Sequence, residues 1–533
     1  MGERRLLSGN EAVALGALHA GCARGVGYPG TPSTEILQSY DAIGGVAEWA
    51  PNEKVAAEVA LGVAFAGAWA LTTMKHVGLN VAADVLFTAA YSGVQGALVF
   101  AVADDPGLAS SQDEQDTRRY GIAAGVPVIE PADAQEAYDY TRLAFTISAR
   151  WKIPVILRLT TRVSHTTSVV KAIDKVETPP VPHFVRDIPG RVMIPGHARI
   201  KHKELRAKLN EIREWCETEG PNTVFPGGKE LGIVSAGVPS LHAREAAPEA
   251  AMLKLGMTYP LPFKLILAFL KGQKRTVVIE ENDPYLVEQI RAAGGDVPWN
   301  PEAYRMGELT VDRVKRVLVG DTTPEAPPPK GKPPKLCTAC PHGYVFEIFK
   351  KHDCIVAGDI GCYTLAALPP LSAMDSQICM GASIGVGLGL RHVLPENEAR
   401  RVVSVIGDST FMHSGLTGLA EMVYNPPPTG HVLVILDNLT TAMTGQQEHP
   451  GTGRKLDHTP TKRIMIEDVA RAMGVPTVVV LDPVRQTKEF EAELLKALKD
   501  DGITVIIGRQ PCLLAAGRIR ALEQQQSGCG GAT

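Results

Sequence analysis

The sequence lacks a marked excess of either charge. Its 54 Lys and Arg residues against 58 Asp and Glu residues give a formal net charge of −4 over 533 residues. A nucleic-acid-binding surface is strongly basic, so this balance argues against a nucleic-acid partner. With 45% hydrophobic and 21% charged residues, the composition is that of a globular protein of roughly three to four domains.

Long apolar segments are also missing. Gly, Asp or Lys interrupts each apolar run before it is long enough to cross a bilayer. The first residues, MGERRLLSGNEAVALG, contain no long apolar core of a secretory signal. We therefore expect a cytoplasmic protein without a membrane partner.

A disulfide framework is the third absence. The nine Cys are an odd number, and their spacing is not that of a small disulfide-bonded fold. In the reducing compartment expected here, clustered Cys are more often metal ligands than disulfides. One such cluster begins with the C-x₂-C pair of Cys337 and Cys340.

Strand-like and helix-like segments alternate along most of the chain. The segments ALVFAVADDPG (97–107) and IPVILRLTTRVSH (153–165) are typical of buried strands that end in loops, and the residues between them have helical periodicity. This alternation of strands and helices predicts parallel sheets, which bind ligands at the carboxyl ends of their strands. The expected fold class is α/β, with several parallel-sheet domains.

Composition shifts suggest where the domains begin and end. Two Pro-rich stretches interrupt the strand-and-helix rhythm and are interpreted as connections. The predicted order is a first domain (1–181), a connecting segment (182–226), a smaller α/β domain (227–321), a Pro-rich linker (322–335), a third domain (336–520) and a flexible tail (521–533). The first and third domains have the same alternation of strands and helices, although no sequence repeat relates them.

Polar residues end two strands of the third domain that are expected to be neighbours. Gly407, Asp408 and Ser409 follow the first strand, and Asn438 follows the next. The side-chain oxygens of Asp408 and Asn438, with the main-chain carbonyl of Thr440, are hard donors that suit Mg²⁺. Gly407 and Ser409 leave room for a diphosphate over a helix N-terminus. The alternative is two ordinary strand-to-loop turns without a ligand, where Asp, Asn and Gly are also common.

These two strand ends together resemble the thiamin-diphosphate signature, in which GDG is followed by NN. Here the pair is written GDS and DN, with Ser409 and Asp437 in place of Gly and Asn. The resemblance implies that the small polar stretch after Leu436 surrounds a Mg²⁺-bound diphosphate. It also places Met443 and Thr444 among the cofactor-binding residues.

Thiamin enzymes need a Glu that hydrogen-bonds the aminopyrimidine ring, so that the thiazolium carbon loses its proton. The segment PNEKVAAEVALG offers Glu53 and Glu58. We choose Glu53, because it opens a predicted helix at the strand-end side of the first domain, whereas Glu58 is expected to be partly exposed. The alternative is that Glu53 has only a structural role, as a carboxylate that the helix dipole stabilises at a helix N-terminus.

Segments spread over nearly the whole chain resemble the large subunit of indolepyruvate:ferredoxin oxidoreductases. They include YPGTPSTEI, NEKVAAEVALG, MKHVGLNVAAD, ADDPGLASSQDEQDTR, CTACPHGYVF, GDIGCYTL and LDNLTTAMTGQQEHPGTG. The resemblance implies oxidative decarboxylation of an aryl-2-oxoacid with coenzyme A, giving an aryl-acyl-CoA, CO₂ and two electrons. It also implies pyrimidine-binding, transketolase C-terminal-like and diphosphate-binding modules, with thiamin diphosphate between modules of one chain or of neighbouring chains.

The same resemblance assigns further residues and partners. By position, Thr31 in YPGTP would bind the substrate carboxylate or carbonyl, and His76 in MKHVG would lie near the thiazolium ring, although a lone His is more often structural. The implied partners are a small (β) subunit, the aryl-2-oxoacid, coenzyme A and an external electron acceptor, in a dimer of heterodimers. Indolepyruvate, phenylpyruvate and hydroxyphenylpyruvate all stay possible as substrates.

The sequence departs from this family in its cysteines. The family usually ends in two C-x₂-C-x₂-C-x₃-C-P runs, and this sequence contains neither. Cys337, Cys340, Cys362 and Cys512 follow the order of the cofactor-proximal cluster in related enzymes, which implies one [4Fe–4S] cluster. A zinc site or reduced buried thiols would use the same residues. Electrons would then leave to ferredoxin or to a partner that carries clusters or a flavin.

Two other functions compete with this one. A non-oxidative thiamin-dependent decarboxylase would release an aldehyde and would need no cluster, so the four Cys favour the oxidative reaction. A degenerate chain that only binds a partner would have no need of Glu53, Asp408 and Asn438.

Overall fold

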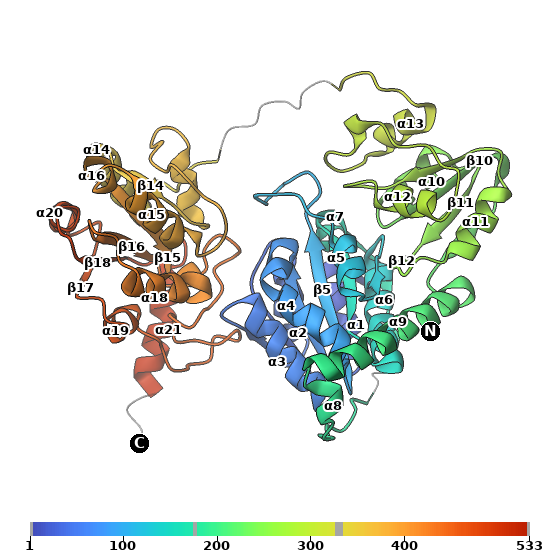
Figure 1. Ribbon diagram of the computed structural model, residues 1–533, viewed down its shortest axis with the longest axis horizontal. Coiled ribbons are helices and arrows are strands. Elements are labelled where there is room, and N and C mark those ends of the chain that lie inside the picture. Colours follow the sequence, from blue (N-terminus) through green and yellow to red (C-terminus); the bar gives the residue numbers. More distant parts are fainter. Residues whose placement is uncertain (1–3, 174–177, 326–333, 530–533) are drawn as a thin grey trace. The chain divides into compact units, whose positions relative to one another are not determined.

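The computed structural model describes residues 4–173, 178–325 and 334–529. The chain folds as two compact units, Met1–Pro327 and Pro328–Thr533, both drawn in Figure 1. Their boundary falls within residues 322–335, the segment interpreted as a linker. None of the helices in the described part of the chain combines the length and apolar character needed to cross a bilayer.

The first unit contains a seven-stranded sheet in the order β12-β6-β7-β5-β4-β2-β3. Every neighbouring pair is parallel except β12 with β6. The strands are Arg24–Gly27 (β2), Ala47–Trp49 (β3), Trp69–Lys75 (β4), Ala97–Asp104 (β5), Val128–Ile129 (β6), Val155–Thr160 (β7) and Met257–Tyr259 (β12). All of β5 is buried, which explains its nearly continuous apolar sequence.

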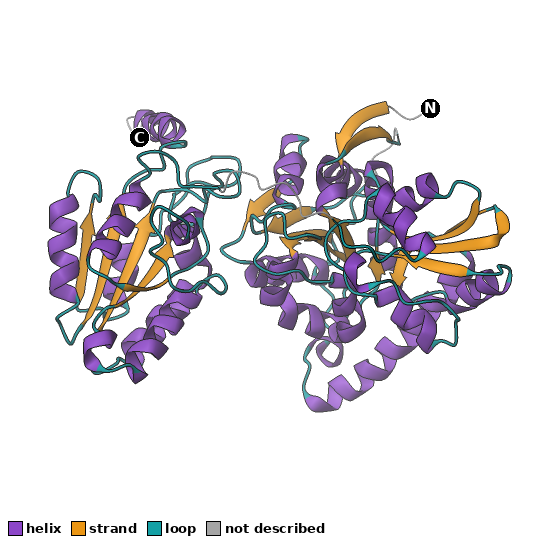
Figure 2. Ribbon diagram, turned by 90° about the horizontal axis from the view of Figure 1, so that it is seen from above, coloured by secondary structure: helices purple, strands orange, loops and turns teal. Residues whose placement is uncertain are grey.

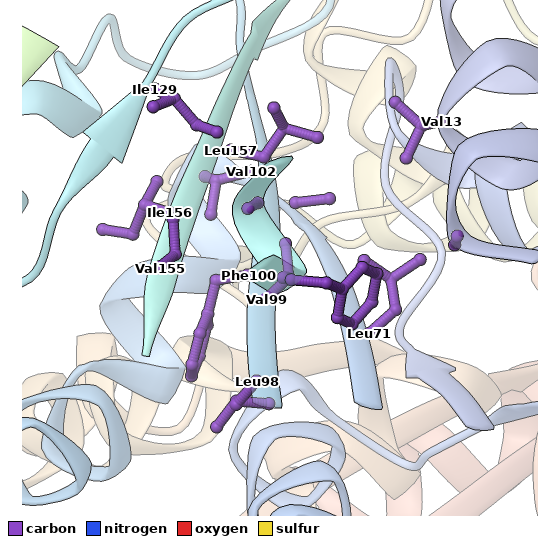
Figure 3. Close-up of a cluster of buried hydrophobic side chains, with 14 of the residues drawn as sticks. Val13, Leu71, Leu98, Val99, Phe100, Val102, Ile129, Val155, Ile156 and Leu157 are labelled. Atoms are coloured by element: carbon purple, nitrogen blue, oxygen red, sulfur yellow. The ribbon is translucent and has the colours of Figure 1, made fainter. Parts of the chain in front are cut away.

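Helices surround this sheet, and a small two-stranded sheet lies beside them. The helices are Gly9–His19 (α1), Thr34–Ala42 (α2), Glu53–Phe65 (α3), His76–Ser92 (α4), Thr117–Ala124 (α5), Ala134–Trp151 (α6), Thr161–His165 (α7), Ile188–Arg191 (α8) and Pro195–Thr218 (α9). The small sheet pairs Arg4–Ser8 (β1) with Thr167–Lys171 (β8). Figure 3 shows Phe100 and Val102 of β5 with Leu157 of β7 in the buried core.

A second, four-stranded sheet in the first unit has the order β13-β10-β11-β9. Its strands are Thr223–Phe225 (β9), Gly228–Ala236 (β10), Ala250–Leu255 (β11) and Thr276–Ile279 (β13), and its helices are Pro239–Ala246 (α10), Phe263–Lys271 (α11), Tyr285–Ala292 (α12), Glu302–Tyr304 (η1) and Val311–Val319 (α13). Buried ions join it to the seven-stranded sheet. Arg158 of β7 donates to Asp104 at 2.7 Å, to Glu130 at 2.6 Å and to Asn282, beyond β13, at 2.9 Å.

The second unit contains a five-stranded, fully parallel sheet in the order β14-β15-β16-β18-β17. Its strands are Ile355–Ala357 (β14), Val402–Gly407 (β15), His431–Asp437 (β16), Thr477–Leu481 (β17) and Ile503–Arg509 (β18). Helices lie on both sides of this sheet, as Figure 2 shows. Alternate residues of β16 enter two different cores, Val434 on one face and Ile435 on the other.

The described residues of the second unit form ten helical elements. They are Pro341–Lys351 (α14), Cys362–Ala367 (η2), Ala382–Val393 (α15), Glu396–Ala399 (α16), Asp408–Thr410 (α17), Phe411–Gly415 (η3), Leu416–Tyr424 (α18), Ile466–Ala472 (α19), Thr487–Ala497 (α20) and Ala516–Cys529 (α21). Helix α21 occupies much of the segment 521–533, which the sequence analysis predicts to be a flexible tail. Its Ala, Leu, Glu and Gln residues favour a helix. The two parallel-sheet units confirm the expected α/β fold class.

Candidate functional site

The two polar strand ends of the second unit lie side by side. In the parallel register of β15 and β16, Gly407 pairs with Leu436. The buried carboxylate of Asp408 follows directly and accepts hydrogen bonds from the main-chain N–H groups of Ser409 and Leu439, both at 2.8 Å. The structure therefore brings the end of β15 against the end of β16, as the sequence predicts for Asp408 and Asn438.

Asn438 is held by groups on two sides. Its Nδ2 lies 3.2 Å from Nε2 of His342, and its Oδ1 accepts from the main-chain N–H of Thr440 at 3.1 Å. Burial lowers the pKa of His342 to about 4, so the imidazole is neutral and its Nε2 can accept the amide proton. This contact fixes which end of the amide carries the oxygen, the atom that a metal ion would need.

Gly407 and Ser409 border a tight space. A Cβ atom at Gly407 would lie 3.0 Å from the ring of Tyr363, whose hydroxyl accepts from the Gly407 N–H at 2.9 Å. Ser409 Oγ accepts from the hydroxyl of Thr441 at 2.8 Å. The ring of Tyr363 therefore leaves little room for a side chain at position 407.

The rest of the polar stretch forms a compact loop. The main-chain N–H of Thr441 donates to the carbonyl of Gln447 at 2.9 Å, and Thr444 Oγ1 donates to Gln447 Oε1 at 2.6 Å. Thr440 Oγ1 also donates to the Gln447 carbonyl, at 3.2 Å. Met443 is exposed on this loop. Both Met443 and Thr444 were expected to touch the cofactor, and that expectation stays a prediction.

Two contacts at this site were not foreseen from the sequence. His449 Nε2 lies 3.2 Å from Asp408 Oδ2, and although burial opposes ionisation of Asp408, His449 keeps the pKa of its carboxyl below the usual value. Burial and the nearby Asp408 raise the pKa of Asp437 to about 6. Arg509 Nε donates to Asp437 at 2.6 Å, and its positive charge offsets the repulsion between the Asp437 and Asp408 carboxylates. The parallel register of β16 and β18, which pairs Asp437 with Arg509, is the one signal that could have indicated the second contact.

The four predicted cluster ligands, Cys337, Cys340, Cys362 and Cys512, line one cavity of about 90 Å³ in the second unit. Burial raises the pKa of the Cys362 thiol to about 11, and the other three thiols add to the effect. Four mutually repelling thiolates need a cation among them to be stable. Within the described residues, no three His, Cys, Asp or Glu side chains already have the arrangement of a metal site.

The Cys cavity adjoins the Asn438 strand end. The walls of the cavity include His342, Asn438 and Gln446 besides the four thiols and several apolar side chains. The main-chain N–H of Cys512 donates to the carbonyl oxygen of Asn438 at 3.0 Å. β16 and β18 are neighbouring parallel strands whose last pair is Asp437 with Arg509, so the loops that carry Asn438 and Cys512 leave the sheet side by side.

Glu53 lies at the corresponding strand ends of the first unit. It is the first residue of α3, is 5% exposed and follows Asn52, which caps the helix by accepting from the N–H of Val55 at 2.9 Å. A Cβ atom at Gly78 would lie 2.4 Å from Glu53 Oε1, so only Gly leaves space for this carboxylate. Glu58 is exposed and pairs with Lys54, as the choice between the two Glu residues expects.

Thr31 and His76 follow strands of the same sheet edge. Thr31 is partly buried in the loop after β2, and Gly30 next to it packs against Lys75 at the end of β4. His76 is buried at the start of α4; its Nε2 lies 3.2 Å from the carbonyl oxygen of Asp113, and its buried Nδ1 has no hydrogen-bond partner among the described residues. The strand order β4-β2-β3 thus brings His76, Thr31 and Glu53 to neighbouring positions on one edge.

Comparisons with known proteins agree with this arrangement. Residues 15–187 match the family model "Pyruvate flavodoxin/ferredoxin oxidoreductase, thiamine diP-bdg", and residues 359–507 match "Thiamine pyrophosphate enzyme, C-terminal TPP binding domain". These matches confirm the expected thiamin-diphosphate-binding fold, and each contains one of the two predicted strand-end sites.

Curated relatives match almost the entire chain. The indolepyruvate oxidoreductase subunit IorA of Archaeoglobus fulgidus is 40% identical over 98% of this chain and 88% of its own length. The subunit of the same name from Thermococcus kodakarensis is 40% identical over 96% of this chain and 86% of its own length. A solved 2-oxoglutarate:ferredoxin oxidoreductase from Magnetococcus marinus has the same fold, with a TM-score of 0.51 and 18% identity over 60% of this chain and 65% of that one.

Proposed function

Since the chain belongs to the family of indolepyruvate oxidoreductase IorA subunits and is a thiamin-diphosphate-dependent 2-oxoacid oxidoreductase, we propose that its substrate is an aryl-2-oxoacid of the indolepyruvate type. The products are an aryl-acyl-CoA and CO₂, and the electrons leave through an iron–sulfur cluster. The relatives' name supports the aryl substrate. The contact between Cys512 and Asn438 is the observation that carries the electron-exporting part of the proposal.

Asp408, Asn438 and the carbonyl of Thr440 would hold Mg²⁺, and Gly407 and Ser409 would receive the diphosphate. This assignment is supported by the buried Asp408 carboxylate and by the His342 contact that fixes the Asn438 amide. When bound, thiamin diphosphate supplies the electron sink for decarboxylation.

The first unit supplies the groups that act on the aminopyrimidine ring and on the substrate. Glu53 would hydrogen-bond the aminopyrimidine, and its packing on Gly78 holds the carboxylate in a fixed position. Thr31 would donate its hydroxyl to the substrate carboxylate or carbonyl. His76 would use its unpaired Nδ1 to bind or orient the reacting group, since a buried donor or acceptor without a partner is costly.

Cys337, Cys340, Cys362 and Cys512 would ligate one [4Fe–4S] cluster, which accepts single electrons. The proposal is supported by the shared cavity and by the raised pKa of the Cys362 thiol, which would ionise there only beside a strongly positive centre. A cluster here would lie beside Asn438, and therefore beside the proposed diphosphate site. The electrons would pass on to ferredoxin or to a cluster- or flavin-containing subunit.

The partners follow from the family. We infer that a small (β) subunit joins this chain in a dimer of heterodimers in the cytoplasm, and that coenzyme A and the aryl-2-oxoacid bind the assembled enzyme. Neither nucleic acid nor membrane takes part.

The decisive assay is coenzyme A-dependent reduction of methyl viologen by the anaerobically purified complex. Indolepyruvate, phenylpyruvate and hydroxyphenylpyruvate should each be tested against 2-oxoglutarate and pyruvate. The proposal expects dye reduction and acyl-CoA with the aryl acids and far less with the other two. Aldehyde release without dye reduction would identify a non-oxidative decarboxylase instead.

A further inference from the structure

A cleft of about 520 Å³ opens on the first unit at the amino ends of its strands. Its lining includes residues 92–95, which precede β5, and Lys152, which precedes β7. Residues of α8 and α9 line its other side. Glu53 follows the carboxyl end of β3. Seven residues of β4 separate the two edges, about 23 Å at the usual rise of a strand, so this cleft is distinct from the candidate active site.

Cations dominate the lining of the cleft, and two of them form no direct ion pair with any described residue. Lys152 Nζ donates to the carbonyl of Gln95 at 2.7 Å, and Lys208 Nζ donates to the carbonyl of Lys152 at 3.2 Å. Within the described part of the chain, no carboxylate lies within ion-pairing distance of either ammonium group. Burial lowers the pKa of Lys208. The charges of Lys201 and Lys152 lower it further, and Glu204 and Glu211 of α9 offset this only in part.

Arg191 adds a rigid donor. Its guanidinium group lies over the ring of Phe65 at 5.0 Å and over the ring of Phe184 at 4.8 Å. Nη2 donates to Gln95 Oε1 at 2.7 Å, while the buried Nη1 has no hydrogen-bond partner among the described residues. A planar guanidinium held by two rings is well suited to bind a phosphate without losing further conformational entropy.

The remaining charged residues do not neutralise the site. Lys201 already pairs with Glu204 at 2.8 Å. Among the described residues, Asp187 is the one carboxylate in the lining, and it accepts the main-chain N–H of Gly190 at 3.0 Å at the start of α8. Lys152, Arg191 and Lys208 therefore leave an excess of positive charge, which an anion would stabilise.

A smaller chamber of about 270 Å³ adjoins the cleft. It shares Gln95 and Lys152 with the cleft and is also lined by Trp69, Pro180 and His183. The two chambers together have the size of a site for a small organic molecule, with phosphate-binding cations at one end and ring-bearing side chains at the other.

We propose that this double cleft binds a phosphate-bearing molecule of nucleotide size, with its phosphates at Lys152, Arg191 and Lys208 and its remaining part toward Trp69. The ligand fastens the connecting segment, which carries Arg191 and Lys208, to the amino edge of the sheet. The site is not catalytic, because it lies on the edge of the sheet opposite Glu53. It therefore regulates or stabilises the enzyme and does not carry a reactant.

The test is calorimetry on the anaerobic complex saturated with Mg²⁺ and thiamin diphosphate, so that the cofactor site is already filled. The probes are inorganic tripolyphosphate and ADP. We compare the unmodified chain with the double variant Lys152→Gln/Lys208→Gln. The matched control is Lys203→Gln, an exposed Lys of α9 outside the cleft.

The proposal expects both probes to bind, ADP more tightly, and the double variant to weaken both at least about tenfold, as the loss of two charged contacts implies. The control should bind as the unmodified chain does. Absence of binding, unchanged binding by the double variant or an equal loss in the control would overturn the site. Equal affinity for the two probes would overturn the nucleotide-size part. Should the double variant fold poorly, Lys152→Gln alone, at an exposed position, must still weaken binding.

Discussion

The main-chain N–H of Cys512 donates a hydrogen bond to the carbonyl oxygen of Asn438, 3.0 Å away. Asn438 belongs to the proposed diphosphate site, and Cys512 belongs to the cavity that the four predicted cluster ligands share. The parallel pairing of β16 with β18 ends at Asp437 and Arg509, so this contact joins the two loops that directly follow the pair. A cofactor that gives up electrons and a cluster that takes them one at a time would thus be neighbours by construction of the fold.

Asp408→Ala is expected to abolish binding of Mg²⁺ and thiamin diphosphate. The substitution removes the buried carboxylate that the main chain of Ser409 and Leu439 orients, and it leaves those N–H groups without their acceptor. Calorimetric titration of the cofactor-free protein measures this loss directly. Asp457→Asn, on a mostly exposed side chain of the same unit, should leave binding unchanged. Normal cofactor affinity in Asp408→Ala would contradict the metal assignment.

Glu53→Gln is expected to retain cofactor binding and to lower turnover by about 10²–10⁴-fold, the usual contribution of a positioned proton-transfer group. The Gln amide can still hydrogen-bond the aminopyrimidine ring, but it can no longer exchange a proton with that ring. The measurement is kcat for viologen reduction at saturating cofactor. Glu58→Gln, which removes only an exposed partner of Lys54, should stay near the unmodified rate. Full activity in Glu53→Gln would show that another group activates the cofactor.

Gly78→Ala tests whether the position of Glu53 matters as well as its charge. The new methyl group would lie 2.4 Å from Glu53 Oε1, so the carboxylate must move. We expect turnover to fall and the free energy of unfolding to fall by about 1–3 kcal/mol, the usual cost of overpacking.

Gly62→Ala in α3 is the matched control for this experiment. No heavy atom lies within 4 Å of the added Cβ, and Ala favours a helix by about 0.5–1 kcal/mol over Gly. This variant should be as stable as the unmodified chain or more so, with full activity. A Gly78→Ala variant with the kinetics of Gly62→Ala would mean that the fixed position of Glu53 is unimportant.

The second unit should lose stability in mild acid because of His431. This imidazole is buried in β16 with Nε2 2.8 Å from Ser404 Oγ, and burial holds its pKa well below the ordinary value, with Arg391 lowering it further. The unfolded chain takes up a proton below about pH 6.5 and the folded chain does not. The stability that the neutral imidazole contributes is therefore complete above that pH and decreases on acidification, by at most about 1.4 kcal/mol per pH unit.

His431→Gln should flatten this acid dependence when thermal unfolding is followed between about pH 7 and pH 5, the window set by the ordinary His pKa. His202→Gln changes an exposed imidazole of α9 in the first unit and should preserve the slope. If His431→Gln retained the full slope, other groups would have to account for it.

Much of this site could be predicted from local patterns. The apolar runs that end at Gly407 and Asp437 define two buried strands, and the rule that parallel strands end at one edge brings Asp408 and Asn438 together. Glu53 could be chosen over Glu58 because a helix-opening residue near a strand end is buried there, whereas the next turn faces solvent.

The remaining contacts depend on distant parts of the chain meeting. His342 lies just after the linker and His449 lies beyond the polar loop, so neither spacing nor periodicity connects them to Asn438 and Asp408. Arg509 reaches Asp437 only through the register of β18 against β16. Such pairs are fixed by tertiary packing, which a single sequence does not specify.

The central claim, an electron-accepting cluster beside the cofactor site, is tested most directly by iron and acid-labile sulfide analysis with EPR after dithionite reduction. We predict about four irons per chain and a reduced-cluster signal in anaerobically purified protein. Cys512→Ser should lose both, whereas Cys379→Ser, an exposed thiol outside the cavity, should keep both. Zinc in the cavity, or no metal other than Mg²⁺, would contradict the account and make non-oxidative decarboxylation the better-supported reaction.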